Sequence, residues 1–454
     1  MNVPHLIDRN QATLKLLFVG TLSLVMLIPL VMVRGVIDER QGMQHQAQAT
    51  IAQRWGGGQM IGGLVALSQS TVETRDPRGT DARQNWRAQV LPEVDLEARL
   101  TTEFRYLGIY EVPVYTTGIS VSGVVDPALL RDSAADGDLV LWLPLADVRG
   151  VRDVSDLRLG DIDIPARPLD AGAAACGIFG LQFTLKASDR ARLWADRDPD
   201  DTGKHIPYRL NLRLAGSHSL QFLPLADTTR VSLEADWPHP EFIGQFLPAE
   251  RTITETTTAR WTLLGLNRPF AGTWHLEDLG WQQLAMSAFG LRLETPVDAY
   301  QRNERSVKYG FLFISLTFFT LFLFEVMTGR PLHPVPYVLT GAALAVFYLV
   351  LLALSEYLPF AAAFALAAGL LLAIVAPYTG VVLGGRRRGV LVGLMMAVTY
   401  GLLYVLVSAE HAALLLGSLA LLAAIAGLMY LTRRVDWYGY GRSGGAVRDE
   451  GRSG

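Results

Sequence analysis

The sequence predicts a polytopic α-helical membrane protein with six transmembrane helices and a large β-rich domain inserted between helices 1 and 2. Two observations predict this fold. Six apolar stretches occur, one near the start of the chain and five crowded into its last third. The long polar insert between the first two stretches contains segments in which apolar and polar residues alternate. A hydrocarbon core of about 30 Å needs about 20 apolar residues of helix to cross it.

The apolar stretches are continuous and lack the alternation of membrane-barrel strands, so helices are expected. They are Leu16–Val33, Tyr309–Phe324, Val335–Leu354, Tyr357–Gly385, Gly389–Ala409 and Ala412–Thr432. The first stretch has a basic flank, as a signal peptide does, but it continues into Arg34–Arg40 without a small-residue cleavage pattern. An uncleaved signal anchor is therefore expected.

Positive charge in the short loops predicts the orientation, because Lys and Arg accumulate on the cytoplasmic side. The clusters that fall on one side of six spans are Arg9 with Lys15, Arg330, Arg386–Arg388, and Arg433 with Arg434. The opposite loops, around Glu356 and Glu410, carry no Lys or Arg. Both termini are therefore expected in the cytoplasm and the insert outside it. The cluster Arg302, Arg305 and Lys308 is an exception to this rule, and the other four clusters outnumber it.

The insert is predicted to be a mostly antiparallel sheet or sandwich. Clean alternation marks strands at 208–214 and 231–234, and a short apolar run marks another at 138–143. A polar helix is expected from Gly35 to about Gln59, stopped by glycines 56–58. The polar segment Thr71–Leu91 is expected to be a loop.

Four regions follow from this pattern. They are a cytoplasmic N-terminus with the first transmembrane helix (1–34), the β-rich domain (35–308), a five-helix transmembrane bundle (309–432) and a disordered cytoplasmic tail (433–454). An insert of about 270 residues is large enough to bury a core of its own, as one large domain or two smaller ones.

Composition excludes few classes of protein. The formal net charge is −3, so no basic field predicts a nucleic-acid partner. The only cysteine, Cys176, rules out an intramolecular disulfide and is expected to be a buried, inert thiol. An acidic, turn-rich patch at 198–203 lacks the glutamate that an EF-hand loop requires, so calcium binding there is the weaker interpretation.

No motif for catalysis or for a cofactor is present. The glycines at 56–58 and 62–63 lack the lysine of a phosphate-binding loop. Four histidines of the insert are scattered and have no metal-ligand spacing. No cofactor, metal ion or catalytic residue is therefore expected.

Three carboxylates lie at the edge of predicted spans: Glu325, Glu356 and Glu410. Each is expected to reach headgroups or water and to anchor a helix end. Charge at membrane depth is costly and often functional, so transport or proton transfer is the alternative. Glu325 is the most interesting of the three because apolar residues follow it, and Arg330 is its nearest expected partner.

The segment Trp237-Pro238-His239-Pro240 is the other candidate. Two prolines fix φ and favour extended conformations at Trp237 and His239. A structural corner is expected, with a binding site as the alternative.

This segment carries a resemblance to a known family. Trp237–Phe242, followed by Gly244 and Phe246–Pro248, resembles the signature of the CreD family of bacterial inner-membrane proteins. Further matching motifs are Tyr309–Phe313 leading into Phe324-Glu325, His333-Pro334 with Tyr337, Leu351–Glu356, Ala413–Ser418 and Leu431–Tyr438. Gly62-Gly63 stands where family members tend to have Gly-Pro.

The resemblance implies a bacterial inner-membrane, multi-pass protein with a periplasmic domain. Its family is described as cell envelope integrity proteins, associated with a two-component system, with tolerance to a nuclease colicin and with β-lactam stress. The expectation is a non-catalytic protein that supports envelope integrity or the envelope stress response. Its expected partners are the lipid bilayer, other envelope proteins or peptidoglycan, and no nucleic acid. The alternatives are a transporter or lipid-handling protein and, less favoured, a periplasmic hydrolase.

Overall fold

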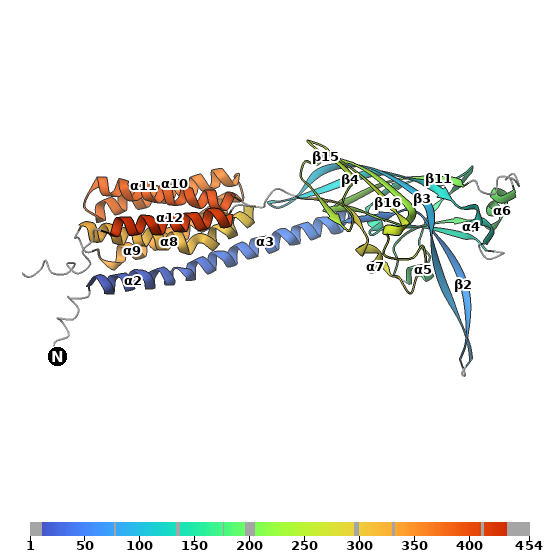
Figure 1. Cartoon of the computed structure of the whole chain (residues 1–454), viewed down its shortest axis with the longest axis horizontal. Helices are drawn as coiled ribbons and strands as arrows, with labels where there is room; N and C mark the ends of the chain where they lie inside the picture. Colours follow the sequence, from blue (N-terminus) through green and yellow to red (C-terminus); the bar gives the residue numbers. More distant parts are fainter. Residues whose placement is uncertain are drawn as a thin grey trace, which may run out of the picture. The chain divides into compact units, whose positions relative to one another are not determined.

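The computed structural model describes residues 11–76, 79–132, 137–175, 177–195, 205–294, 299–328, 332–409 and 413–433. It divides into two compact units (Figure 1). A helical unit contains Met1–Met43 and Val297–Gly454, and a β-rich unit contains Gln44–Pro296. Four expectations concern residues outside the described ranges: those for Cys176, the acidic patch 198–203, Glu410 and the disordered tail.

Long apolar helices make up the helical unit. They are α2 (Gln11–Val25), α3 (Leu27–Trp55, which continues into the β-rich unit), α8 (Ala299–Thr328), α9 (Pro334–Ser355), α10 (Phe360–Val382), α11 (Arg386–Ser408) and α12 (Ala413–Thr432). In the described part, five helices are long and apolar enough to cross a membrane, the first being α2 and α3 together. The apolar stretch of α12 is shorter, so the count of six spans stays a prediction.

A proline explains the irregularity at Met26 between α2 and α3. Pro29 has no N–H to donate to the carbonyl of Val25, so one intrahelical bond is lost. Helical bonds continue across the gap, from the N–H of Met26 to the carbonyl of Leu22 (3.0 Å) and from Leu30 to Met26 (3.4 Å). The two segments therefore follow one another as one interrupted helix.

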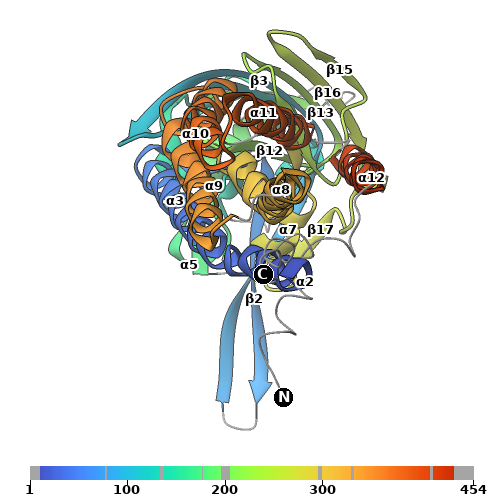
Figure 2. The same ribbon diagram turned by 90° about the vertical axis from the view of Figure 1, so that its left-hand side faces the viewer.

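The helices α8, α9, α10 and α11 pack in a ring, with α2 against α8 and α12 against α11 (Figure 2). Aromatic rings fill the interior, where Phe347 contacts Tyr400 edge-on with centroids 4.7 Å apart. Glycines bring α10 and α11 together, because a Cβ on Gly389 would lie only 2.5 Å from the Cα of Gly380. Large apolar side chains such as Ile374 and Val398 are exposed on the outer surface, as expected for lipid contact.

Two sheets form most of the β-rich unit. The larger sheet has fourteen strands, with the order β8-β7-β11-β4-β3-β2-β5-β10-β9 along its main path. Its strands are β2 (Val65–Asp76), β3 (Gly79–Leu107), β4 (Tyr110–Val125), β5 (Leu139–Pro144), β6 (Val151–Val154), β7 (Leu157–Leu159), β8 (Ile162–Ile164), β9 (Ala166–Pro168), β10 (Gly180–Leu185), β11 (Ile206–Ser217), β13 (Ala226–Ala235), β15 (Glu250–Ile253), β16 (Thr257–Leu264) and β17 (Thr273–His275).

The smaller sheet has the order β1-β12-β18-β14. Its strands are β1 (Gln59–Gly62), β12 (Ser219–Leu223), β18 (Phe289–Leu293) and β14 (Pro240–Gly244). The short helices of the unit are α4 (Pro127–Asp132), α5 (Ala171–Ala175), α6 (Ala187–Ala195) and α7 (Trp281–Met286). Most pairings of both sheets are antiparallel, and β1–β12 and β3–β13 are parallel.

The main core lies between the two sheets. Buried residues from the large sheet, such as Leu96, Ile119 and Leu210, share one apolar cluster with Phe222 and Phe289 of the small sheet. The predicted strands at 138–143, 208–214 and 231–234 are confirmed, since they lie in β5, β11 and β13. Their alternation arises because one face of each strand meets this core.

The loop expected at Thr71–Leu91 is wrong. This segment belongs to a long hairpin in which β2 pairs with β3 from Val65–Val90 to Asp76–Gly79, and it extends away from the sheet in Figure 1. Beyond Leu67 and Arg87, no third strand pairs with the described part of the hairpin. A two-stranded ribbon has no core face, so its sequence needs no alternation and reads as polar.

Candidate functional site

The corner Trp237–Pro240 joins β13 to β14 and holds the indole of Trp237 inside the main core. The Trp237 side chain is 5% exposed. Its Nε1 donates to the carbonyl oxygens of His239 (3.0 Å) and Glu294 (3.1 Å), and its own carbonyl accepts from Thr257 Oγ1 (2.6 Å). The corner thus ties β14 to the end of β18, the last described segment before α8.

The other residues of the corner lie at the surface. Pro238 and His239 are exposed and Pro240 is partly buried. The ring of Trp237 contacts Phe104 of β3 at a centroid distance of 5.9 Å. The structural role of this segment stays a prediction, and the geometry that supports it is the burial of Trp237 beside an exposed His239.

A buried ionic cluster surrounds Glu325 near the end of α8. The carboxylate is fully buried, and its Oε1 accepts from the ammonium group of Lys15 and from the backbone N–H of Leu332 (3.0 Å). Its Oε2 accepts from Tyr337 Oη at 2.8 Å. Lys15 also donates to the carbonyl oxygen of Leu332 at 2.7 Å.

This geometry corrects the expected surroundings of Glu325. The carboxylate does not reach headgroups or water but lies inside the protein, in a pair with Lys15 of α2. The partner expected from sequence, Arg330, lies outside the described residues. Sequence reasoning missed Lys15 because 310 residues separate it from Glu325. The available signal was that both residues flank spans on the same predicted side.

Glu356 makes polar contacts at the opposite end of α8, with residues of α3 and α8. It follows α9, its side chain is 9% exposed, and its Oε1 lies 3.6 Å from Arg40 Nε and 3.2 Å from Tyr300 Oη. Asn303 of α8 donates to Ser355 Oγ at 2.7 Å beside it. The first helix, α8 and α9 therefore meet in polar contacts at this end as well.

The spacing of these contacts matches the thickness of a bilayer. Lys15 and Arg40 are 25 residues apart on α2–α3, and Tyr300 and Glu325 are 25 residues apart on the antiparallel α8. A helix rises 1.5 Å per residue, so each separation is about 38 Å. A hydrocarbon core is about 30 Å thick, so both polar clusters suit the headgroup layers.

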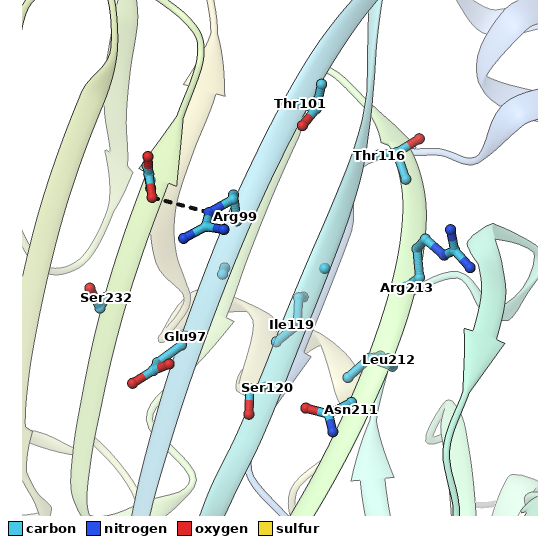
Figure 3. A pocket seen from close by; sticks show the side chains of 13 residues that line it. Glu97, Arg99, Thr101, Thr116, Ile119, Ser120, Asn211, Leu212, Arg213 and Ser232 are labelled. Carbon is cyan, nitrogen blue, oxygen red and sulfur yellow. Dashed lines mark hydrogen bonds and ion pairs between the residues drawn. The ribbon is translucent and has the colours of Figure 1, made fainter.

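A polar groove lies on the solvent-facing side of the large sheet, opposite the core (Figure 3). It has a volume of about 810 Å³ and runs across β11, β4, β3 and β13. Its polar and charged lining comes from alternate residues of these strands: Glu97, Arg99, Thr101, Thr116, Ser120, Asn211, Arg213, Ser232 and Glu234.

Three of the four charged side chains that line this groove are in ion pairs. Arg99 Nε donates to Glu234 Oε2 at 3.2 Å, and Arg213 lies 3.5 Å from Asp153 at the rim. The lining contains hydroxyls and carboxylates but no His, Cys or Lys. It can therefore offer hydrogen bonds to a polar ligand.

A second cavity, of about 580 Å³, lies between α10 and α11. Its walls are mostly apolar and include Ala376, Pro377 and Gly380, and Arg386 lies at its edge. In the described residues, His, Cys, Asp and Glu form no group able to hold a metal ion. His205, His218, His239 and His275 therefore belong to no such group in this part of the chain.

Comparison with known proteins identifies the family. The family model described as "Inner membrane protein CreD" matches residues 11–438. The chain is also 29% identical over 433 residues to Inner membrane protein CreD of Escherichia coli strain K12, and the alignment covers 92% of each chain. The match includes the Trp237 corner, the helices of both polar clusters and the groove strands. This chain belongs to the CreD family of inner membrane proteins.

Proposed function

We propose that the chain is a non-catalytic inner-membrane protein whose β-rich domain, in the periplasm, supports envelope integrity or senses envelope stress. The observation that carries this proposal is the connectivity of the β-rich unit. Both of its chain connections lead into helices, α3 and α8, that are joined to one another by Arg34–Glu304. The helix α2, which precedes α3, is joined to α8 by Lys15–Glu325. A force or ligand acting on the domain would therefore bias one coupled helix pair.

The proposal includes six spans and cytoplasmic termini. The regions are 1–34, 35–308, 309–432 and 433–454, as the sequence predicts. Alkaline phosphatase fused after Asp200 and after Tyr438 tests the topology, because this enzyme is active only outside the cytoplasm. We expect activity only at the first site. An active fusion after Tyr438 would contradict the topology.

The groove is the proposed point of contact with the envelope. Its balanced charges and hydroxyls suit a polar surface, such as another envelope protein or peptidoglycan, and its two arginines are matched by two glutamates, so no positive field attracts nucleic acid. The bilayer is the other partner.

Growth of a deletion strain under a β-lactam or a mild detergent tests the proposed function. The wild-type chain should restore growth, and Ser120→Trp, which fills the groove, should not. Thr252→Trp, on the exposed strand β15, is the matched control and should restore growth. Normal growth with Ser120→Trp at wild-type abundance would show that the groove is not the functional surface. Release of soluble fragments from peptidoglycan by the purified protein would favour a hydrolase.

The apolar cavity between α10 and α11 favours lipid handling as a second candidate function. An acyl chain suits its walls, and Arg386 suits a phosphate group. Native mass spectrometry of the full chain and of Val390→Trp, which adds bulk from an exposed position of the cavity wall, tests this candidate. Equal retention of lipid by the two proteins would count against it.

A further inference from the structure

The floor of the groove contains a glycine between two arginines. Gly118 of β4 pairs with Arg213 of β11 on one side and with Arg99 of β3 on the other. Neighbouring strands lie about 4.8 Å apart, so the Cα atoms of the two arginines are about 10 Å apart across Gly118. All three residues are exposed and line the groove. Two guanidinium groups therefore flank a position that has no side chain.

The space above Gly118 is open. A Cβ atom placed on this residue would meet no other part of the chain within 4 Å. A glycine weakens the interior of a strand, and it often marks a place where a ligand or another backbone approaches closely. Thr116 and Ser120, two residues before and after Gly118 on β4, also line the groove (Figure 3). Two guanidinium groups and two hydroxyls, all able to donate hydrogen bonds, thus surround this position.

A ligand can displace the present partners of both arginines. Arg99 and its partner Glu234 are 79% and 53% exposed, and Arg213 and its partner Asp153 are 61% and 68% exposed. Exposed ion pairs contribute little to stability because water screens them. A planar guanidinium group binds a carboxylate through two parallel, charge-assisted hydrogen bonds. The pair of arginines therefore suits an anionic group placed above Gly118.

A carboxylate outside any ion pair lies next to this position. Glu97 is two residues from Arg99, about 7 Å along β3, and it also lines the groove. Its register partner on β4 is Ser120. In the part of the chain that the structure describes, Glu97 is the one charged side chain of the lining that is in no ion pair. It can accept hydrogen bonds from an ammonium group. The groove thus offers partners for two opposite charges that lie close together.

We propose that the groove binds a short peptide through a free carboxylate above Gly118 and an ammonium group beside Glu97. The stem peptide of peptidoglycan has this chemistry, because its diaminopimelate residue carries both groups on one carbon atom. Protein interfaces are usually anchored by aromatic side chains, and the described lining contains none, which favours the peptide over another envelope protein. This choice of ligand rests on the proposed function of the groove.

Calorimetric titration of the full chain in detergent tests the proposal with three probes. They are the stem tripeptide L-alanyl-γ-D-glutamyl-meso-diaminopimelate, the same tripeptide with its carboxyl groups amidated, and inorganic phosphate. We expect the free tripeptide to bind about ten-fold more tightly than either of the other probes, because it alone supplies both a carboxylate and an ammonium group.

Two variants and two controls assign the binding to this position. Arg213→Gln removes one guanidinium group, and Gly118→Leu fills the open space without changing the charge. Each should weaken binding of the tripeptide about ten-fold. Arg260→Gln is the control for charge, because Arg260 is 70% exposed on the same sheet and pairs with Glu250 outside the groove. Thr258→Leu, at an exposed position of β16, is the control for bulk. Both controls should bind the tripeptide as the wild-type chain does.

Four results would overturn the proposal. They are no binding of the tripeptide, equal binding of the free and amidated tripeptides, equal binding of phosphate and the tripeptide, and an equal loss of binding in Arg260→Gln and Arg213→Gln. The growth assay with Ser120→Trp separates this inference from the proposed function. If the tripeptide does not bind and Ser120→Trp fails to restore growth, the inference alone is lost. If the tripeptide binds and Ser120→Trp restores growth, the inference stands and the groove is not the functional surface.

Discussion

The ammonium group of Lys15 on α2 donates to the buried carboxylate of Glu325 on α8, so an ion pair joins the first two apolar helices inside the protein. The carboxylate is fully buried and Lys15 is 19% exposed on its side chain. Two charges with this little access to water depend on one another, because either one alone would be desolvated without compensation.

Loss of one member of this pair should therefore be strongly destabilising. We expect Glu325→Ala or Lys15→Met to lower the free energy of unfolding by about 3–5 kcal/mol. Glu325→Gln should be milder, since its amide oxygen can still accept from Lys15 and Leu332 and its NH2 group can donate to Tyr337 Oη. Thermal unfolding of the full chain in detergent measures the effect.

The double variant Lys15→Met with Glu325→Leu separates pairing from packing. It should recover part of the loss, because no lone charge remains buried. Arg34→Met is the control: Arg34 and Glu304 also join α3 to α8, but their side chains are 60% and 40% exposed. An exposed pair contributes less than about 1 kcal/mol. Equal effects of Arg34→Met and Lys15→Met would contradict this account of the buried pair.

The cluster at Glu356 should contribute less than the cluster at Glu325. Its partner Arg40 is 42% exposed, so water screens the pair. We expect Glu356→Ala to lower the melting temperature by less than half as much as Glu325→Ala, and Tyr300→Phe to have a small effect of about 1 kcal/mol. A Glu356→Ala protein less stable than Glu325→Ala would reverse this ranking.

Sequence patterns predicted the helices and strands that meet a core or lipid, because burial imposes a period on the residues. The strands β5, β11 and β13 were found in this way. The hairpin around Asp76 was not, since its two strands pair without a core behind them. The groove could not be predicted from the sequence either. Its residues come from four strands, and no local sequence pattern specifies the register that aligns Arg99 with Glu234.

The β-rich unit should fold as a soluble fragment. Residues 35–305 include α3 up to Trp55, whose contacts with β4 complete one of the apolar clusters. We expect circular dichroism dominated by strand, and no loss of structure on chelation or reduction. A helix-dominated spectrum, or unfolding by chelator, would contradict this prediction.

The hydrogen bonds of the Asp147 carboxylate lead us to expect that the protein loses stability in acid. Its carboxylate accepts from the side chain of Arg149, which lowers the pKa of Asp147 against the opposing effect of burial, and it also accepts from the backbone N–H groups of Gly57 and Arg149. A pKa lowered in the folded state means that the stabilisation is complete above the unfolded value, near 3.8, and is lost as the pH falls through the folded value.

The test of this acid dependence is chemical unfolding of the β-rich fragment between pH 6 and pH 2.5. The wild-type fragment should lose more stability across pH 4 to pH 2.5 than Asp147→Asn, which has no carboxyl group to titrate. Asp227→Asn is a control, because Asp227 is an exposed partner of Arg268. Parallel pH profiles for wild type and Asp147→Asn would exclude Asp147 as a source of the acid sensitivity.

Substitutions at Trp237 and His239 distinguish a structural role of this corner from a binding or catalytic role. Trp237→Ala should lower the free energy of unfolding by about 3–5 kcal/mol, because it empties a buried site beside Thr257 and Phe104. Trp237→Phe keeps most of the ring but loses both bonds from Nε1, to the carbonyl oxygens of His239 and Glu294, and should cost about 1–3 kcal/mol. The variant His239→Gln tests the alternative role.

His239→Gln changes only an exposed side chain, since the bond from Trp237 goes to the backbone of His239. The abundance of this variant in the membrane, and the growth of the strain that carries it under envelope stress, should match wild type. A His239→Gln protein that accumulates normally but fails to restore growth would make this exposed imidazole a binding or catalytic group, and the structural interpretation of the corner would then be wrong.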